Sequence, residues 1–266
     1  MSSDIRHVAA LGSSFAAGPG IEPVENRAAG RSARNYARLV AERLGAGLTD
    51  LTVSGATTET VLDTPQRSTR TWFPPQLQGL PSHADLVTIT VGGNDLNYIG
   101  SMYALGIAAR LSASPWTLPL RPVLPRPRIP DPTAEALEDA TANLVRVADA
   151  ARGRAPGARI LLVDYLTVVG TDTRHSRATP FDEASVDGLR RLGRQVSQVF
   201  EAAAARSGAD LVPMAEHSRD HALGSARPWV VGLPDRLRHI RSTAPFHPNA
   251  EGMRATADAI VDHLKA

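Results

Sequence analysis

Four residues spread along the chain are of the types that an acyl-transfer site needs: Ser14, Gly55, Asn94 and His247. A serine on a tight turn can present its hydroxyl as a nucleophile, and a histidine can act as its base. A glycine lets a backbone N–H approach an oxyanion without a Cβ in the way, and an asparagine amide supplies a second donor. Together these residue types indicate acyl transfer through a serine.

Each of these residues lies in a short motif that has an ordinary structural explanation when it is taken alone. A serine beside a glycine is a common turn residue, an asparagine in "GGND" is typical of an Asx turn, and His247 fits a packed loop. The functional hypothesis therefore depends on the four motifs occurring together. They are "GSSFAAG" (12–18), "SGATTET" (54–60), "GGNDLN" (92–97) and "APFHPNAEG" (244–252).

The elements that must position these residues alternate between strands and helices. Apolar runs predict five strands, and helical patterns lie between them. This alternation predicts an α/β fold with a parallel sheet that is covered by helices on both faces. The length of 266 residues suits one domain. The predicted strands are 6–11, 48–53, 86–91, 159–163 and 210–212, and the predicted helices are 33–44, 132–153, 185–208 and a last helix from 248.

The first three motifs directly follow the first three predicted strands. Ligands of open α/β sheets bind at the carboxyl ends of the strands. We therefore expect Ser14, Gly55 and Asn94 at one edge of the sheet. His247 comes from the C-terminal segment, outside the sheet, and has to reach the same edge from there.

With these motifs the chain resembles the SGNH hydrolases, also called the GDSL esterase/lipase family. "GSSFAAG" is similar to the GDSxxxG block of the family, "SGATT" to the second block, "GGND" to the third and "FHPNAEG" to the last. The resemblance runs from residue 12 to residue 252. It implies a three-layer α/β/α sandwich like flavodoxin, with Ser14 as nucleophile and His247 as base. It also implies an oxyanion hole formed by Ser14, Gly55 and Asn94.

Two positions depart from the pattern of this family. Ser13 replaces the usual aspartate before the nucleophile, and we expect this change to cost little because that residue is structural. Ala244 stands where the family carries the acid of its DxxH motif. That acid accepts a hydrogen bond from the histidine Nδ1–H and fixes the tautomer. We expect the backbone carbonyl of Ala244 to take over this role, and Asp235 is a more remote candidate.

The segment 101–132 does not fit the alternation of strands and helices. It is apolar and contains Trp116, and its prolines from Pro115 onward forbid a regular helix there. We interpret it as an insertion that is either a long surface connection or an apolar flap over the site.

Composition excludes several classes of function. The net charge is +2, Lys265 is the only lysine and no cluster of basic residues occurs, so we expect no nucleic-acid partner. The absence of cysteine excludes disulfides, thiolate metal sites and a cysteine nucleophile. We expect no metal and no cofactor. No signal peptide and no membrane-spanning run is apparent, which predicts a cytoplasmic protein unless a leader has been removed.

These observations lead to a serine esterase or lipase that acts on a small-molecule ester or lipid. A deacetylase of acetylated carbohydrates or metabolites would use the same residues. A non-catalytic binding protein with the same fold is a third hypothesis, which is suggested by Ala244 at the position of the acid. The sequence does not specify the oligomeric state.

Overall fold

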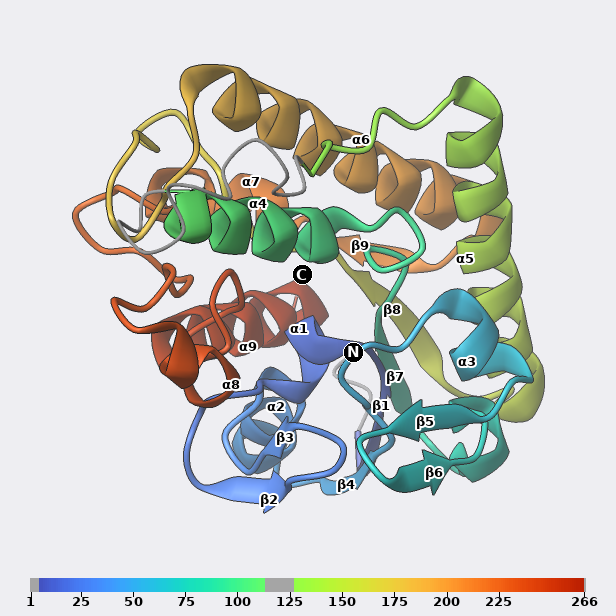
Figure 1. Cartoon of the computed structure of the whole chain (residues 1–266). Helices are drawn as coiled ribbons and strands as arrows, with labels where there is room; N and C mark the ends of the chain where they lie inside the picture. Colours follow the sequence, from blue (N-terminus) through green and yellow to red (C-terminus); the bar gives the residue numbers. More distant parts are fainter. Residues whose placement is uncertain (1–4, 113–126, 266) are drawn as a thin grey trace.

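The chain folds around a five-stranded parallel sheet with helices on both faces (Figure 1). This computed structural model describes residues 5–112 and 127–265. The strand order is that of flavodoxin, with the first strand placed between the second and the third. The predicted α/β/α sandwich is therefore confirmed. Across the sheet the strands are β4 (Gly47–Asp50), β1 (His7–Gly12), β7 (Leu86–Thr90), β8 (Arg159–Val163) and β9 (Asp210–Val212).

The long helices cover the sheet in two layers. Helix α2 (Tyr36–Leu44) packs against α9 (Ala250–Lys265), whereas α5 (Ala134–Arg154) packs against α6 (Glu183–Ser207). Their starts carry polar caps that satisfy free backbone N–H groups: Asn35, Thr133 and Asp182 accept from the first turns of α2, α5 and α6. Strands β7 and β8 are buried between these layers, as their continuous apolar sequences predict.

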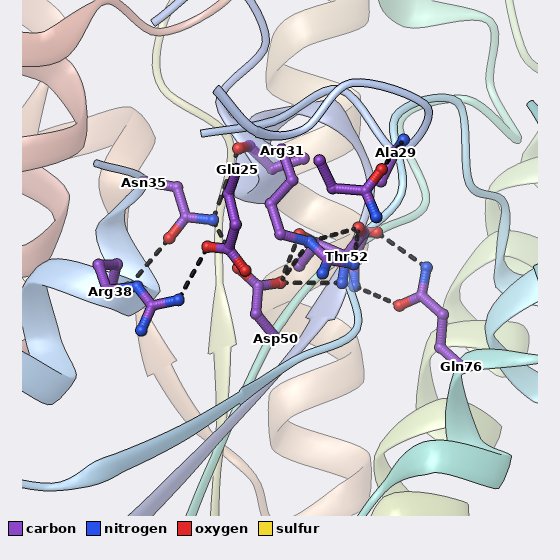
Figure 2. Close-up of polar contacts among 11 residues, drawn as sticks. Glu25, Ala29, Arg31, Asn35, Arg38, Asp50, Thr52 and Gln76 are labelled. Atoms are coloured by element: carbon purple, nitrogen blue, oxygen red, sulfur yellow. Dashed lines mark hydrogen bonds and ion pairs between the residues drawn. The ribbon is translucent and has the colours of Figure 1, made fainter. Parts of the chain in front are cut away.

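The second strand ends earlier than predicted, at Asp50 and not at Val53. The Asp50 carboxylate accepts hydrogen bonds from Thr52 N–H at 3.0 Å and from Asn35 Nδ2 at 2.7 Å, and Arg31 Nε lies 3.3 Å from it. Arg31 also donates to the Thr52 carbonyl (Figure 2). This buried network turns the chain out of the sheet and toward residues 54–58.

Several short elements surround the sheet and were not predicted. Two of them are hairpins, β2 (Val24–Asn26) with β3 (Arg31–Ser32) and β5 (Gln66–Ser68) with β6 (Thr71–Phe73). The others are short helices: α1 (Ser14–Ala17), α3 (Thr58–Leu62), η1 (Gln76–Gly79), α7 (Met214–His217), η3 (Arg219–His221), η4 (Leu237–His239) and α8 (Ile240–Thr243).

The expected insertion at 101–132 begins with a helix and otherwise stays a prediction. Its first part belongs to α4 (Tyr98–Ser112), because no proline occurs before Pro115 and a helix can continue to that point. Residues 113–126, including Trp116, lie outside the described residues, so the expected flap is not described. Residues 127–133 lead into α5 without a regular element. Among the described residues, no helix combines the length and apolar character needed to cross a membrane.

Candidate active site

Ser14 lies at the first position of α1, directly after β1. The turn is held from two sides. Ser13 N–H donates to the Thr90 carbonyl at 2.9 Å, and the Gln76 amide clamps the backbone of Gly12 with bonds of 2.7 and 3.0 Å (Figure 2). Gly12 has a φ of +148°, and a Cβ there would lie 2.5 Å from the Thr90 oxygen. This close approach requires glycine, and it fixes the place where the chain turns to Ser14.

The structure brings His247 to Ser14. The Nε2 atom of His247 lies 2.8 Å from Ser14 Oγ, and its Nδ1 lies 2.9 Å from the Pro245 carbonyl oxygen. A carbonyl can only accept, so Nδ1 must carry the hydrogen and Nε2 is left with its lone pair. Ser14 Oγ–H then donates to Nε2. This is the tautomer that a general base needs.

The group that orients His247 differs from the expectation. In the structure the hydrogen bond of Nδ1 goes to the carbonyl of Pro245, one residue beyond Ala244. The Ala244 carbonyl also raises the pKa of His247, but less than the Pro245 carbonyl does. Asp235, the more remote candidate, is exposed and lies near the guanidinium groups of Arg110 and Arg177.

Burial lowers the pKa of His247 to about 4, since the charged imidazolium loses its hydration inside the protein. The backbone carbonyls of Pro245 and Ala244 act in the opposite direction and raise this pKa, but burial outweighs them. At neutral pH the imidazole is therefore uncharged and ready to accept a proton.

The loop around His247 is held by the neighbouring segment. Val231 N–H donates to the His247 carbonyl at 2.9 Å, and Phe246 N–H donates to the Val231 carbonyl at 2.6 Å. Ala244 and Phe246 adopt positive φ angles of 43° and 66°, which are unfavourable for residues with a Cβ. Backbone strain of this kind persists only where the surrounding structure enforces it, and it is common at functional sites.

Gly55 and Asn94 lie on two loops that are joined to each other. Asn94 Nδ2 donates to the carbonyl of Ala56, the residue after Gly55, at 2.8 Å. Next to it, the Asp95 carboxylate accepts from Thr58 N–H at 3.1 Å. Gly55 has a φ of +84°, a conformation that a glycine adopts without strain. One hydrogen of the Asn94 amide is used by Ala56, which leaves the other for a ligand.

Aromatic rings surround the imidazole. The ring centroids of Phe15 and Tyr103 lie 5.4 and 6.0 Å from that of His247. Phe246 in turn packs against Tyr103 and against Phe181. These rings contribute to the burial of the imidazole.

Three groups that hold this site were not predicted from the sequence. Gln76 comes from an irregular segment, and nothing in its sequence context marks it. The Pro245 carbonyl depends on the backbone angles of its neighbours, which the sequence does not reveal. Tyr165 lies two residues after β8 and contacts Ser13 and Gly93. It would have been found if the residues after the fourth strand had been read like those after the first three.

No group of three or more histidine, cysteine, aspartate and glutamate residues that could hold a metal ion occurs within 5–112 and 127–265. The arrangement can offer the chemistry of an activated hydroxyl, because a serine Oγ and an imidazole nitrogen lie at hydrogen-bond distance from one another. The loops of Gly55 and Asn94, which the sequence predicts as oxyanion donors, are joined to each other by the Asn94–Ala56 hydrogen bond.

Comparison with known proteins shows the family to which the chain belongs. Residues 10–255 match the family model described as the GDSL-like Lipase/Acylhydrolase family. Lipase 2 of Streptomyces coelicolor is 32% identical over 271 residues, covering 96% of this chain and 84% of that protein.

Solved structures share the fold over nearly the whole chain. The extracellular lipase of Streptomyces rimosus has a TM-score of 0.68 at 23% identity, covering 97% of this chain and 99% of that one. Phospholipase A1 of Streptomyces albidoflavus NA297 has a TM-score of 0.69 at 20% identity, with the same coverage. At these identities the likeness concerns the fold alone.

Proposed function

Because the chain belongs to the GDSL-like lipase/acylhydrolase family, we propose that it is a serine esterase or lipase that works through an acyl-Ser14 intermediate. The observation that carries this proposal is the contact of 2.8 Å between His247 Nε2 and Ser14 Oγ, with Nδ1 bonded to the Pro245 carbonyl. A base in the correct tautomer at hydrogen-bond distance from a serine hydroxyl is the arrangement that activates this weak nucleophile.

In the first step His247 Nε2 takes the proton of Ser14 as Oγ attacks the ester carbonyl carbon. The carbonyl oxygen becomes an oxyanion, which the N–H groups of Ser14 and Gly55 and the Asn94 side chain stabilise. Loss of one such donor typically lowers turnover by about 10²–10³. The ester C–O bond then breaks, and the imidazolium gives its proton to the leaving alkoxide.

In the second step His247 removes a proton from water, which attacks the carbonyl carbon of acyl-Ser14. The bond to Oγ breaks, Ser14 recovers its proton from the imidazolium, and the carboxylic acid is released. During both steps the imidazolium keeps its Nδ1–H bond to the Pro245 carbonyl, so a backbone group takes the place of the usual acid. Each step uses only groups of this chain and water.

Tyr103 favours an apolar acyl group over an acetyl group, because its ring is only partly buried and lies 6.0 Å from that of His247. The Streptomyces rimosus protein is described as an extracellular lipase, and the Streptomyces coelicolor protein as a lipase. For this chain, a lipid ester as substrate is a proposal, and the cytoplasmic location stays a prediction.

The test is hydrolysis of p-nitrophenyl esters with acyl chains of increasing length, by the wild type and by Ser14→Ala. We expect turnover that depends on Ser14, with an optimum above acetate. An optimum at acetate would favour the deacetylase. Ester turnover retained by Ser14→Ala would contradict the assignment of the nucleophile, and a folded protein without turnover on any ester would favour the binding protein.

A further inference from the structure

Tyr165 stands behind the nucleophile turn with its hydroxyl bonded to two separate loops. Its Oη lies 3.1 Å from Ser13 Oγ and accepts a hydrogen bond of 3.1 Å from Gly93 N–H. Ser13 precedes Ser14 in the nucleophile turn after β1, and Gly93 precedes Asn94 in the loop after β7. A single phenol at the end of β8 therefore connects the two loops that carry the nucleophile and a proposed oxyanion donor.

The direction of the bond to Gly93 follows from the chemistry of the groups. The Gly93 N–H can only donate, so the phenolic oxygen accepts there, and the same hydroxyl shares a second hydrogen bond with Ser13 Oγ. Tyr165 is buried, and burial raises the pKa of its hydroxyl, so the phenol keeps its proton. The hydroxyl accepts from the Gly93 loop, and between Tyr165 Oη and Ser13 Oγ either hydroxyl can be the donor.

The ring of Tyr165 adds contacts to the same two loops. Its centroid lies 4.6 Å from that of Phe15, so both residues that flank Ser14 contact Tyr165. On the other side a Cβ at Gly93 would lie 2.7 Å from the ring carbon that carries the hydroxyl. The Gly93 loop can approach this closely only because position 93 has no side chain.

We infer that Tyr165 is a positioning residue. Through its contacts with Ser13 and Gly93, its hydroxyl holds the nucleophile turn in a fixed position relative to the loop that carries Asn94. This inference rests on the proposed function. It also assigns a role to Ser13, the position at which the chain departs from the aspartate of its family. A misplacement of about 1 Å in such a site can lower the rate by about 10²-fold, although the residue does not touch the reacting atoms.

The experiment compares Tyr165→Phe, Ser13→Ala and the double variant with the wild type on the best p-nitrophenyl ester. We expect Tyr165→Phe to lower kcat by about 10- to 100-fold and to leave KM within about threefold, since the lost hydroxyl affects the spacing of the catalytic groups and not the binding of substrate. Ser13→Ala should lower kcat less, because the bond from Gly93 remains. The double variant should lose no more than Tyr165→Phe, because both changes remove the same bond.

A matched control is Tyr36→Phe. Tyr36 is also fully buried, and its hydroxyl lies 2.9 Å from Thr90 Oγ1, but it contacts neither Ser13 nor Gly93. We expect this variant to lower the melting temperature about as much as Tyr165→Phe and to keep kcat. The inference is overturned if Tyr165→Phe has the kcat of the wild type and a melting temperature lowered about as much as that of Tyr36→Phe. Tyr165 would then have a structural role only.

Two further results separate the inference from the proposed function. If Ser14→Ala keeps its ester turnover, the proposed function fails and the inference fails with it. If Ser14→Ala is inactive and Tyr165→Phe turns over normally, the inference alone is wrong. If Tyr165→Phe does not fold, Ser13→Ala still tests the inference. If the bond between Ser13 and Tyr165 positions the turn, Ser13→Ala must lower kcat and leave KM unchanged.

Discussion

The Nε2 atom of His247 lies 2.8 Å from Ser14 Oγ, although 233 residues separate the two in the sequence. The first sheet strand ends just before Ser14, and the last helix begins just after His247. The contact therefore joins the two ends of the fold. On its other side, the imidazole is bonded to a backbone carbonyl and not to a carboxylate. This pairing has consequences for pH dependence, for substitutions at Ala244 and for the support of the nucleophile turn.

The first prediction concerns the acid limb of the pH profile. Because burial lowers the pKa of His247 to about 4, the base stays unprotonated well below neutral pH. We expect kcat/KM to rise with pH through an apparent pKa near 4 and to be flat above it, since kcat/KM reports the free enzyme. Initial rates on a p-nitrophenyl ester, quenched into alkali before reading, would measure this. Circular dichroism at each pH separates titration from unfolding, and an acid limb near the ordinary histidine pKa would contradict the buried neutral base.

The second prediction concerns restoration of the family's acid by Ala244→Asp. Nδ1 of His247 has one hydrogen, and the Pro245 carbonyl already accepts it at 2.9 Å. Ala244 is buried, so the new carboxylate would lose hydration without a free donor on the imidazole. We expect kcat/KM to change by less than about tenfold and the melting temperature to fall.

Ala244→Asn is the matched control, because it has the same shape without the charge. The test compares kcat/KM of both variants with that of the wild type on one p-nitrophenyl ester. If Ala244→Asp, but not Ala244→Asn, gains much more than tenfold, the carbonyl is an inadequate partner for His247 and the dyad account is wrong.

The third prediction concerns the clamp on the nucleophile turn. Gln76→Leu removes both hydrogen bonds to the backbone of Gly12. The Gly12 carbonyl keeps its bond of 3.1 Å from Val53 N–H, but the buried Gly12 N–H is left unpaired, which costs about 1–3 kcal/mol. We expect a lower free energy of unfolding and a lower kcat, because the turn before Ser14 loses its support. Urea unfolding and ester kinetics would measure the two effects.

Gln78→Leu serves as the control for this clamp. Gln78 lies on the same short helix η1, its side chain is exposed, and its hydrogen bonds to Pro75 and Arg154 use its backbone N–H and carbonyl. We expect it to keep both stability and kcat. An equal effect of the two substitutions would show that the hydrogen bonds of Gln76 do not support the turn.

The fourth prediction concerns Asp164, a buried carboxyl at the end of β8. Burial raises its pKa to about 7, and hydrogen bonds from Tyr165 N–H, Ser197 and Ala215 act in the opposite direction. Between about pH 4 and 7 the folded state holds a proton that the unfolded state has lost. The stabilising contribution is therefore complete below about pH 4 and is lost as the pH rises through 7.

Asp164→Asn removes this titration. We expect its free energy of unfolding, relative to the wild type, to increase as the pH rises from about 4 to 7. Subtracting the two proteins cancels His247, whose lowered pKa makes stability rise with pH over about 4 to 6.5 in both. Urea midpoints at several pH values measure the difference, with the exposed Asp187→Asn as control. A difference that does not vary with pH would contradict a raised pKa at Asp164.

Much of the fold was predictable because the sheet strands are strongly apolar and alternate with helices. Strands such as "RILLV" have the composition of a buried strand, and their predicted bounds match β8. Helix α4 was missed because residues 98–112 are apolar nearly all round and show no amphipathic period. The hairpins were missed because two or three residues per strand are too few for an alternating pattern.

The site residues that directly follow sheet strands were predictable from the sequence. The groups whose position depends on tertiary structure were less so. Ser14, Gly55 and Asn94 all follow sheet strands, and the structure brings His247 to Ser14 as the motifs predicted. The choice of Pro245 over Ala244 depends on two strained residues, Ala244 and Phe246. No local sequence signal reports which of two adjacent carbonyls will face an imidazole.

The most direct test of the central claim is to locate the covalent bond. The protein is treated with a fluorophosphonate, digested with trypsin, and the peptide from His7 to Arg27, which contains both Ser13 and Ser14, is sequenced by fragmentation in a mass spectrometer. The account predicts the label on Ser14, no label in Ser14→Ala, and labelling that persists in Ser13→Ala. A label on another residue, or a folded wild type that does not react, would contradict Ser14 as the nucleophile that His247 activates.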